Sequence, residues 1–320
     1  MKISRRSFLK KGLAGTLLLS AATLPEPLTA IAASPSTSAS HGRRAKRILI
    51  IGLDGICVAG FQQARTPNLD TLLADGALSL ETRVVMPSVT LPNWTSHLTA
   101  SGPELHGVVD NGWTLDKHKL PSIETDADGY YPSVFKILKE TRPNIKTAFY
   151  YNWPNLIYPY NKKYFDEYFF EENDAYLESY EKAFNFMARN REDTTLVFLY
   201  SVHTDHAGHK HKWMSPEYIS SIEEADENIG KLLDKMKREG LYDNTHFMFI
   251  TDHGGIGYGH GGVSTDEMIV PWGITGPGIT HGLKMKEPNN TVNTASVILH
   301  LFQVKQPLCW TGEVPESIFK

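Results

Sequence analysis

The 320-residue chain has little cysteine, few long apolar runs and, beyond its first segment, a deficit of positive charge. Two cysteines, Cys57 and Cys309, are too few for a disulfide scaffold. Cys57 follows an apolar strand and is expected to be buried, although the sequence leaves open whether the two cysteines pair. After the N-terminal segment, no stretch has the roughly 18 uninterrupted apolar residues that a membrane-spanning helix needs. No stable membrane span is therefore expected in the mature chain.

Residues 1–33 have the pattern of an export signal. Residues 4–10 read Ser-Arg-Arg-Ser-Phe-Leu-Lys, an apolar run follows, and small residues at 29–34 suit a cleavage site. A twin arginine in this context is typical of twin-arginine export. The alternative is a membrane-anchoring helix, for which the run is short. We expect a periplasmic or extracellular protein, with residues 34–45 as a linker that runs into a small basic cluster.

The mature chain is acidic. Residues 1–33 hold five of the 32 basic residues and one of the 36 acidic ones, so the remainder carries an excess of eight negative charges. Proteins that bind nucleic acid through phosphate contacts are usually basic, so no nucleic-acid binding is expected. No feature predicts a protein partner. Residues 46–320 suffice for one large domain with its own core.

Apolar strands alternate with amphipathic helices along the chain. We expect strands at 46–53, 79–86, 146–151, 194–201, 246–251 and 267–275, and helices at 66–76, after Pro92, and at 131–142, 172–190, 215–240 and 293–302. This alternation predicts an α/β fold, a doubly wound and mostly parallel sheet with helices on both faces. The aromatic-rich stretch 110–172 is expected to form a small cap-like excursion, either as ordinary packing or as a substrate wall.

Three buried strands are each followed by possible metal ligands. These are Asp54, Asp205, His209, Asp252, His253 and His260. The carboxyl ends of strands in open α/β sheets line the ligand crevice, and crowded carboxylates there would take up protons unless a cation is present. Mixed Asp and His suit zinc, and six ligands fit two zinc ions that clamp the oxygens of a phosphoryl transfer. His206 and His211 are expected to be solvated, and Asp54 alone could instead be a turn residue.

The stretch 86–108 places a hydroxyl, Thr90, at the start of a helix and just before Leu-Pro-Asn. In one interpretation Thr90 caps the helix. In the other it is a nucleophile, because a helix N-terminus binds anions and a hydroxyl there could attack one. We favour the second interpretation.

These pieces together resemble the alkaline phosphatase superfamily, and within it the type I phosphodiesterase/nucleotide pyrophosphatase family. The matching segments lie between about residues 47 and 279 and read ILIIGLDG, TPNLDTLLADGA, PSVTLPNWTSHLTASGPELHGVVDN, YPSVFKILKE, DHAGH and TDHGG…GHGG. The resemblance implies an alkaline-phosphatase-like fold. It also implies an enzyme that hydrolyses a small phosphodiester or phosphoanhydride.

The resemblance assigns a role to each candidate residue. It implies that Thr90 is a nucleophile held by metal and passes through a covalent phospho-threonine. Asp54, Asp252 and His253 would hold one zinc ion, and Asp205, His209 and His260 the other. Asn93 is expected to hydrogen-bond a phosphoryl oxygen, and Asn111 and Trp153 are expected to contact substrate.

Some features depart from the family pattern. Trp94 stands where the family often has histidine, and His260 follows His253 by only seven residues, as in compact bacterial members. The insertions that shape the nucleotide site in animal members are largely absent, which leaves the natural substrate open. A phosphomonoesterase on the same scaffold would often carry an arginine near Thr90, where only Arg83 is on offer. A sulfatase is disfavoured by the lack of a Cys-x-Pro-x-Arg motif. A non-catalytic metal-binding protein remains the alternative of another class.

Overall fold

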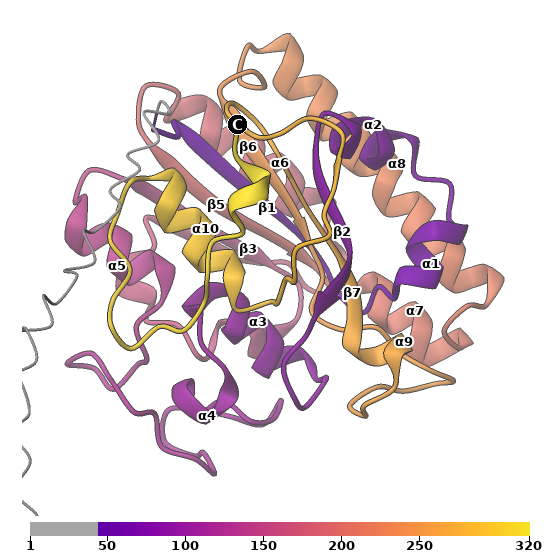
Figure 1. Cartoon of the computed structure of the whole chain (residues 1–320), viewed down its shortest axis with the longest axis horizontal. Coiled ribbons are helices and arrows are strands. Elements are labelled where there is room, and N and C mark those ends of the chain that lie inside the picture. Colours follow the sequence, from indigo (N-terminus) through magenta and orange to yellow (C-terminus); the bar gives the residue numbers. More distant parts are fainter. Residues whose placement is uncertain (1–43) are drawn as a thin grey trace, which may run out of the picture. The chain divides into compact units, whose positions relative to one another are not determined.

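The computed structural model describes residues 44–320, so the predicted signal segment and nearly all of the linker lie outside the described residues. Eight strands within residues 44–320 form one sheet in the order β4-β3-β5-β1-β6-β7-β2-β8 (Figure 1). The strands are β1 (Arg47–Leu53), β2 (Gly76–Arg83), β3 (Lys146–Tyr151), β4 (Glu167–Phe170), β5 (Thr195–Ser201), β6 (Thr245–Ile250), β7 (Ile269–Thr275) and β8 (Leu283–Lys284). Among them β7 alone is antiparallel to its neighbours, so the predicted, mostly parallel sheet is confirmed.

Helices cover both faces of the sheet (Figure 1). One face carries α3 (Thr90–Thr99), α5 (Val134–Thr141) and α10 (Asn293–Leu301), and the other carries α1 (Val58–Gln63), α2 (Pro67–Ala74), α6 (Leu177–Arg189) and α8 (Pro216–Arg238). Shorter helices α4 (Pro103–His106), α7 (His203–His211) and α9 (Thr265–Met268) lie in the connections. No helix of residues 44–320 is long and apolar enough to cross a membrane.

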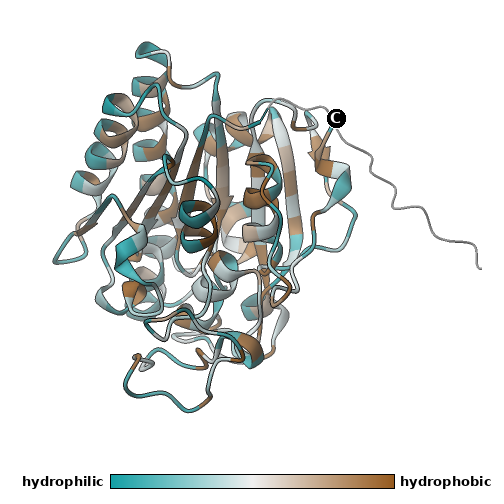
Figure 2. Cartoon of the chain, turned by 90° about the vertical axis from the view of Figure 1, so that its left-hand side faces the viewer, coloured by the Kyte–Doolittle hydropathy of each residue, from teal (hydrophilic) through white to brown (hydrophobic). Residues whose placement is uncertain are grey.

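The alternation of side chains along each strand builds two cores. In β1, Ile48 and Ile50 join one core with Trp94 of α3, while Leu49 and Ile51 join the other. Successive side chains of a strand point to opposite faces, so a strand covered on both sides must be apolar throughout. Figure 2 shows the resulting hydrophobic strands between helices of mixed polarity. The two cysteines are free and belong to different cores, Cys57 to the core of Leu49 and Cys309 beside that of Ile48.

The aromatic-rich stretch 110–172 is not a separate excursion. It supplies α5, β3 and β4 to the main layers, and β3 pairs with β4 on one side and with β5 on the other. Most of its aromatic side chains fill the cores, including Tyr150 and Tyr160, and few, such as Tyr158 and Tyr168, are exposed. The predicted cap is therefore corrected: ordinary packing accounts for most of the aromatics, because a strand buried on both faces needs large side chains.

Strand register places the ends of the three predicted ligand-bearing strands together. Leu53 at the end of β1 lies opposite Ser201 of β5, and Gly52 lies opposite Ile250 of β6. The Asp54 amide then donates to the Ser201 carbonyl at 3.1 Å. Three segments distant in sequence consequently leave the sheet at one edge.

Candidate metal centre and nucleophile

One group of possible ligands is completely buried. It comprises Asp54, Asp252 and His253, each with no exposed surface, and their ligand atoms lie within 4.8 Å of one another. Asp252 Oδ1 accepts the Gly55 amide, while Asp54 Oδ1 and Asp252 Oδ2 have no hydrogen-bond partner. These two oxygens lie 3.4 and 3.2 Å from His253 Nε2. Buried, unpartnered carboxylate oxygens beside an imidazole suit a divalent cation.

A second group surrounds Asp205, on α7. Asp205 Oδ1 is buried without a partner and lies 3.7 Å from His260 Nε2, and Asp205 Oδ2 lies 3.5 Å from His209 Nε2. Ligand atoms of Asp205, His260 and His253 also lie within 4.8 Å of one another. His209 lies at the rim, with 42% of its side chain exposed. The predicted second ligand set is therefore brought together, and His253 lies between the two groups.

All three histidines are held in the tautomer that metal binding needs. The Nδ1–H groups donate to backbone carbonyls: His253 to Gly254 at 2.9 Å, His260 to Ser88 at 3.0 Å and His209 to Tyr258 at 2.9 Å. Because Nδ1 carries the proton, the lone pair of each ring is on Nε2, which faces the aspartates. Such second hydrogen bonds orient metal-ligating histidines in general.

The protonation behaviour of the groups points the same way. Burial, followed by the nearby Asp205 charge, raises the pKa of Asp54 to about 8. Burial raises the pKa of Asp205 to about 7 and that of Asp252 well above its ordinary value. Burial, together with the neighbouring His260, lowers the pKa of His253 well below its ordinary value. A divalent cation would stabilise the ionised form of these carboxylates, and the donor set fits zinc in both groups.

Thr90 is the first residue of α3 and directly faces the buried group. The N-cap is Val89, so the helix-capping interpretation of Thr90 is wrong. Its hydroxyl lies 3.2 Å from His253 Nε2, and the residue is only 4% exposed. The first turn therefore presents a hydroxyl to the metal ligands.

Asn93 does not have the geometry expected of it. Its side chain is fully buried and turns back along the helix, where the amide nitrogen donates to the Pro87 and Val89 carbonyls at 3.0 Å each. The amide oxygen accepts the Val85 N–H at 2.8 Å. With both ends of the amide committed, Asn93 holds the segment before Thr90 and has no donor left for a phosphoryl oxygen. Helical side chains lean toward the N-terminus, which explains this direction.

Asn111 lies where Asn93 was expected to act. Its amide oxygen accepts the Leu91 N–H of the first turn at 2.8 Å, and its backbone carbonyl accepts the Asn155 amide at 2.9 Å. Its own amide nitrogen has no partner within the described part of the chain and is partly exposed. Trp153 packs on the small cluster of Leu91, Val108 and Trp113 beside it. The structure thus groups Asn111 and Trp153 with the head of α3.

Two residues that sequence reasoning did not assign orient Asp54. The Trp94 indole N–H donates to Asp54 Oδ2 at 3.2 Å, and the Tyr200 hydroxyl donates to the same oxygen. Burial and the Asp54 charge raise the pKa of Tyr200 far above its usual range, so the hydroxyl remains a donor. Both donors bind Oδ2 and leave Oδ1 for a metal. In the sequence, Trp94 was noted only because the family often has histidine at that position, and Tyr200 was noted only as part of a predicted apolar strand.

Trp213 supports the loop that carries His260. Its indole N–H donates to the Gly55 carbonyl, its backbone N–H donates to the Gly257 carbonyl, and its ring contacts those of His209 and His260. A Cβ on Gly255 would lie 2.2 Å from this indole, and one on Gly254 would lie 1.9 Å from a backbone carbonyl. The Gly-Gly pair after His253 therefore lies in a tightly packed segment that has no room for side chains.

A profile of the family "Type I phosphodiesterase / nucleotide pyrophosphatase" matches residues 48–288. The chain belongs to this family, as its motifs predicted. An uncharacterised pyrophosphatase/phosphodiesterase of Schizosaccharomyces pombe is 27% identical over 236 residues, 65% of this chain and 44% of that protein. The bis(5'-adenosyl)-triphosphatase ENPP4 of Bos taurus is 25% identical over 219 residues, 65% of this chain and 47% of that protein. The chain spans about half the length of the curated relatives it matches.

Solved structures share the fold. Murine ectonucleotide pyrophosphatase/phosphodiesterase 5 has a TM-score of 0.70 at 16% identity, over 85% of this chain and 98% of that chain. A second structure of that protein is an inactive variant, with threonine replaced by alanine, in complex with AMP. The lipoteichoic acid synthase LtaP of Listeria monocytogenes has a TM-score of 0.65 at 19% identity, over 84% of this chain and 75% of that chain. The predicted alkaline-phosphatase-like fold is confirmed.

Proposed function

We propose that the chain is a zinc-dependent phosphodiesterase that acts through Thr90. The observation that carries this proposal is the 3.2 Å approach of the Thr90 hydroxyl to His253 Nε2, in the middle of the two ligand groups. Asp54, Asp252 and His253 would hold one zinc ion, and Asp205, His209 and His260 the other. Bound zinc ions would neutralise the charge that develops on the attacking and leaving oxygens.

The residues of the chain have distinct tasks in this proposal. Thr90 Oγ forms a bond to phosphorus, its hydroxyl proton is released, and the bond from phosphorus to the leaving group breaks. Water then cleaves the phospho-threonine and restores the hydroxyl. The Asn111 amide, whose oxygen accepts the Leu91 N–H, would donate to a non-bridging phosphoryl oxygen. Asn93 is left with positioning the segment before Thr90.

The substrate proposed is a small phosphodiester or phosphoanhydride. The donor beside Thr90 is the neutral Asn111 amide, which suits the single charge of a diester better than the double charge of a monoester. One relative is a bis(5'-adenosyl)-triphosphatase, and one solved structure of similar fold is in complex with AMP. Both support adenine dinucleotides as the first natural substrates to test.

Paired hydrolysis tests the proposal. Purified mature chain, with zinc restored, is given bis-p-nitrophenyl phosphate or p-nitrophenyl phosphate. We expect the diester to be hydrolysed faster than the monoester. Its rate of hydrolysis should fall at least about 10³-fold in Thr90→Ala, because the nucleophile is gone. The free energy of unfolding should change by no more than about 1 kcal/mol. Thr95→Ala is the matched control, since its hydroxyl donates to the Leu91 carbonyl of the same helix and also bonds with Tyr160, and Thr95 is not among the proposed metal ligands.

The other outcomes identify the rivals. A monoester preference lost in Thr90→Ala would keep the nucleophile and reassign the protein as a phosphomonoesterase. Zinc binding without turnover of either substrate would support the non-catalytic alternative. Equal activity in Thr90→Ala and wild type would rule out the proposed nucleophile.

Export by the twin-arginine route is proposed on the sequence alone, from Arg5 and Arg6 and the apolar run behind them. The route carries folded proteins, which would allow metal loading before export. Replacing both arginines with lysine should retain the unprocessed chain in the cytoplasmic fraction; unchanged processing and location would contradict the proposal.

A further inference from the structure

A cleft of about 430 Å³ lies at the amino ends of the central strands. It is lined by Arg44, Ala45, Lys46, Arg47, Arg191, Glu192, Gly240, Leu241, Asn244, His246 and Pro277. Arg47 begins β1, whereas Asp54 follows the end of the same strand. Seven residues of strand separate the cleft from the ligand groups by about 23 Å. The cleft is therefore not part of the catalytic crevice.

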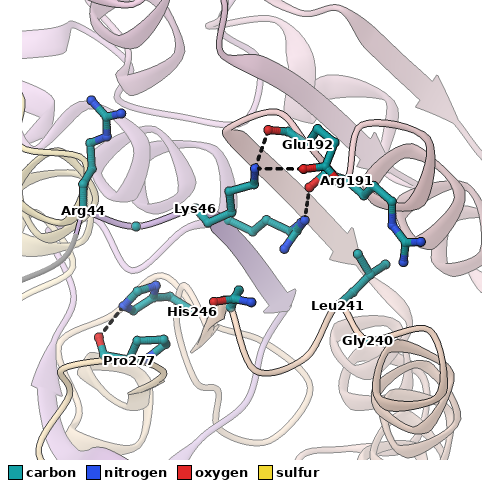
Figure 3. A pocket seen from close by; sticks show the side chains of 11 residues that line it. Arg44, Lys46, Arg191, Glu192, Gly240, Leu241, His246 and Pro277 are labelled. Atoms are coloured by element: carbon teal, nitrogen blue, oxygen red, sulfur yellow. Dashed lines mark hydrogen bonds and ion pairs between the residues drawn. The ribbon is translucent and has the colours of Figure 1, made fainter.

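The charge lining this cleft is unbalanced. Four residues of the lining, Arg44, Lys46, Arg47 and Arg191, are cationic, and one, Glu192, is acidic. The Arg191 Nη2 group donates to the Glu239 carbonyl, which leaves its charge uncompensated. Lys46 already uses that residue, with Nζ donating to the Glu192 carbonyl and lying 3.9 Å from its carboxylate (Figure 3). The surplus positive charge stands out in an acidic protein.

Arg47 is the one deeply buried cation of the set. It is only 4% exposed, its Nη2 donates to the Arg191 carbonyl, and its Nε–H is buried without an acceptor. Burial lowers the pKa of Arg47. The Glu192 charge opposes this shift, and the Arg191 charge adds to it. A buried guanidinium donor without a partner costs free energy that an anionic ligand would recover.

We propose that this cleft binds a small organic phosphate, with the phosphate group at Arg47 and Lys46. Guanidinium groups match phosphate geometry and hold it through charge-assisted hydrogen bonds. Leu241, Ala45 and Pro277 supply an apolar lining for the rest of the ligand, and the volume lies within the range of small-molecule sites. This inference does not depend on the proposed hydrolysis.

The Arg47 Nε–H resonance is a direct probe of the cleft. Zinc-loaded, ¹⁵N-labelled protein is titrated with inorganic phosphate or AMP at constant ionic strength set by chloride, and Arg47→Lys assigns the resonance. We expect the resonance to move and to saturate, with AMP binding more tightly than inorganic phosphate because of the apolar lining. Ligand bound at the catalytic crevice would leave this resonance unchanged, since it lies at the opposite end of β1.

Charge variants separate a built site from a general electrostatic effect. The double variant Arg44→Gln/Arg191→Gln changes two exposed positions. It should weaken the affinity for AMP by at least about tenfold and leave diester hydrolysis unchanged. Arg65→Gln/Lys231→Gln removes the same charge from exposed positions outside the cleft lining and should bind as wild type. A resonance that does not move, or that responds equally to chloride or equally in both double variants, would overturn the proposal.

Discussion

At the residue scale, two asparagines near Thr90 differ in whether their side-chain amide N–H groups are free to bind substrate. This difference, and not their distance from Thr90 in the sequence, decides which of them can contact a phosphoryl oxygen. Asn93 lies three residues after Thr90, yet its amide is bonded to the Val85, Pro87 and Val89 backbone. Asn111 comes from the segment after α4, and its oxygen is bonded to Leu91 N–H so that its nitrogen remains available. A donor aimed at developing negative charge is worth more than a donor already committed to the backbone.

Asn111→Asp should therefore impair the reaction without unfolding the protein. The carboxylate can still accept the Leu91 N–H, but it cannot donate to a phosphoryl oxygen and repels one. We expect kcat to fall about 10²- to 10³-fold with an almost unchanged Tm. Asn93→Ala should instead leave buried backbone groups unpaired and lower the unfolding free energy by about 1–3 kcal/mol. Steady-state kinetics and thermal unfolding of both variants check this, and a stable Asn93→Ala with the larger rate loss would restore the original assignment.

The donors to Asp54 Oδ2 should set the affinity for the metal. Removing the Tyr200 hydroxyl, in Tyr200→Phe, frees Asp54 to rotate and is expected to weaken zinc binding about 10- to 100-fold. The matched control is Tyr160→Phe, which removes an equally buried hydroxyl that donates to the Trp94 carbonyl and does not touch Asp54. Competition with a chelator measures both affinities. Equal affinities in the two variants would show that Tyr200 only fills space.

At the element scale, what the sequence could predict follows from which signals are local. β1, β5 and β6 were found because apolar residues fill them on both faces, and the residues after them were therefore correctly placed at one edge of the sheet. α7 was missed because His203–His211 has no apolar periodicity, although Asp205 and His209 lie four residues apart on one face. β4 was missed because its aromatic residues were taken for part of a cap.

The rest of the site depends on contacts that no local pattern encodes. Asn111 reaches the head of α3 through a turn whose path the sequence does not reveal. Tyr200 was part of a correctly predicted strand, but which of its neighbours its hydroxyl meets depends on the register with β1. Arg44 and Ala45 were interpreted as the end of a linker, whereas the Ala45 N–H donates to the Leu301 carbonyl of the domain.

The loop from His253 to His260 contains one glycine that has no room for a side chain and another that does, so substitutions at the two positions can be compared within the same loop. A methyl group at Gly255 would lie 2.2 Å from the buried Trp213 indole, whereas one at Gly259 would have nothing within 4 Å. We expect Gly255→Ala to displace His260, with loss of one of two bound zinc equivalents and most of the activity. Gly259→Ala, beside His260 itself, should keep both. Zinc content by elemental analysis checks this, and identical zinc content in the two variants would show that the loop tolerates the displacement.

At the scale of the whole molecule, the parallel sheet gives its two ends opposite characters. The carboxyl ends of β1, β5 and β6 collect aspartates and neutral histidines, which attract a cation. The amino ends of the same strands collect Lys46, Arg47 and Arg191, which attract an anion. A single run of seven residues in β1 connects them, so both sites share one rigid support in the middle of the core.

The buried aspartates should make the stability of metal-free protein fall as pH rises above about 7.5. The pKa values of Asp54 and Asp205 are raised to about 8 and about 7 in the folded chain, but the unfolded values are near 4. Below about pH 7.5 the buried histidines act in the opposite direction, because an unfolded histidine has a pKa near 6.5 and burial lowers the folded pKa of His253 and His260. Above about pH 7.5 these histidines are largely neutral in both states. In that window the folded chain alone retains protons on the aspartates, so deprotonation favours unfolding.

Thermal unfolding between about pH 7.5 and 8.5 measures this effect directly. Chelated protein should lose stability across the window, by up to about 1.4 kcal/mol per pH unit for each aspartate that remains protonated only in the folded state. Zinc-loaded protein should show no such loss, since the cation favours the ionised carboxylates and its binding displaces their protons. Asp205→Asn is the internal control, because an amide cannot titrate and should flatten the metal-free slope. A metal-free stability that is constant or rises across this window would mean that other groups of the chain already stabilise the negative charges of the three aspartates. The argument for a cation at this edge of the sheet would then be lost.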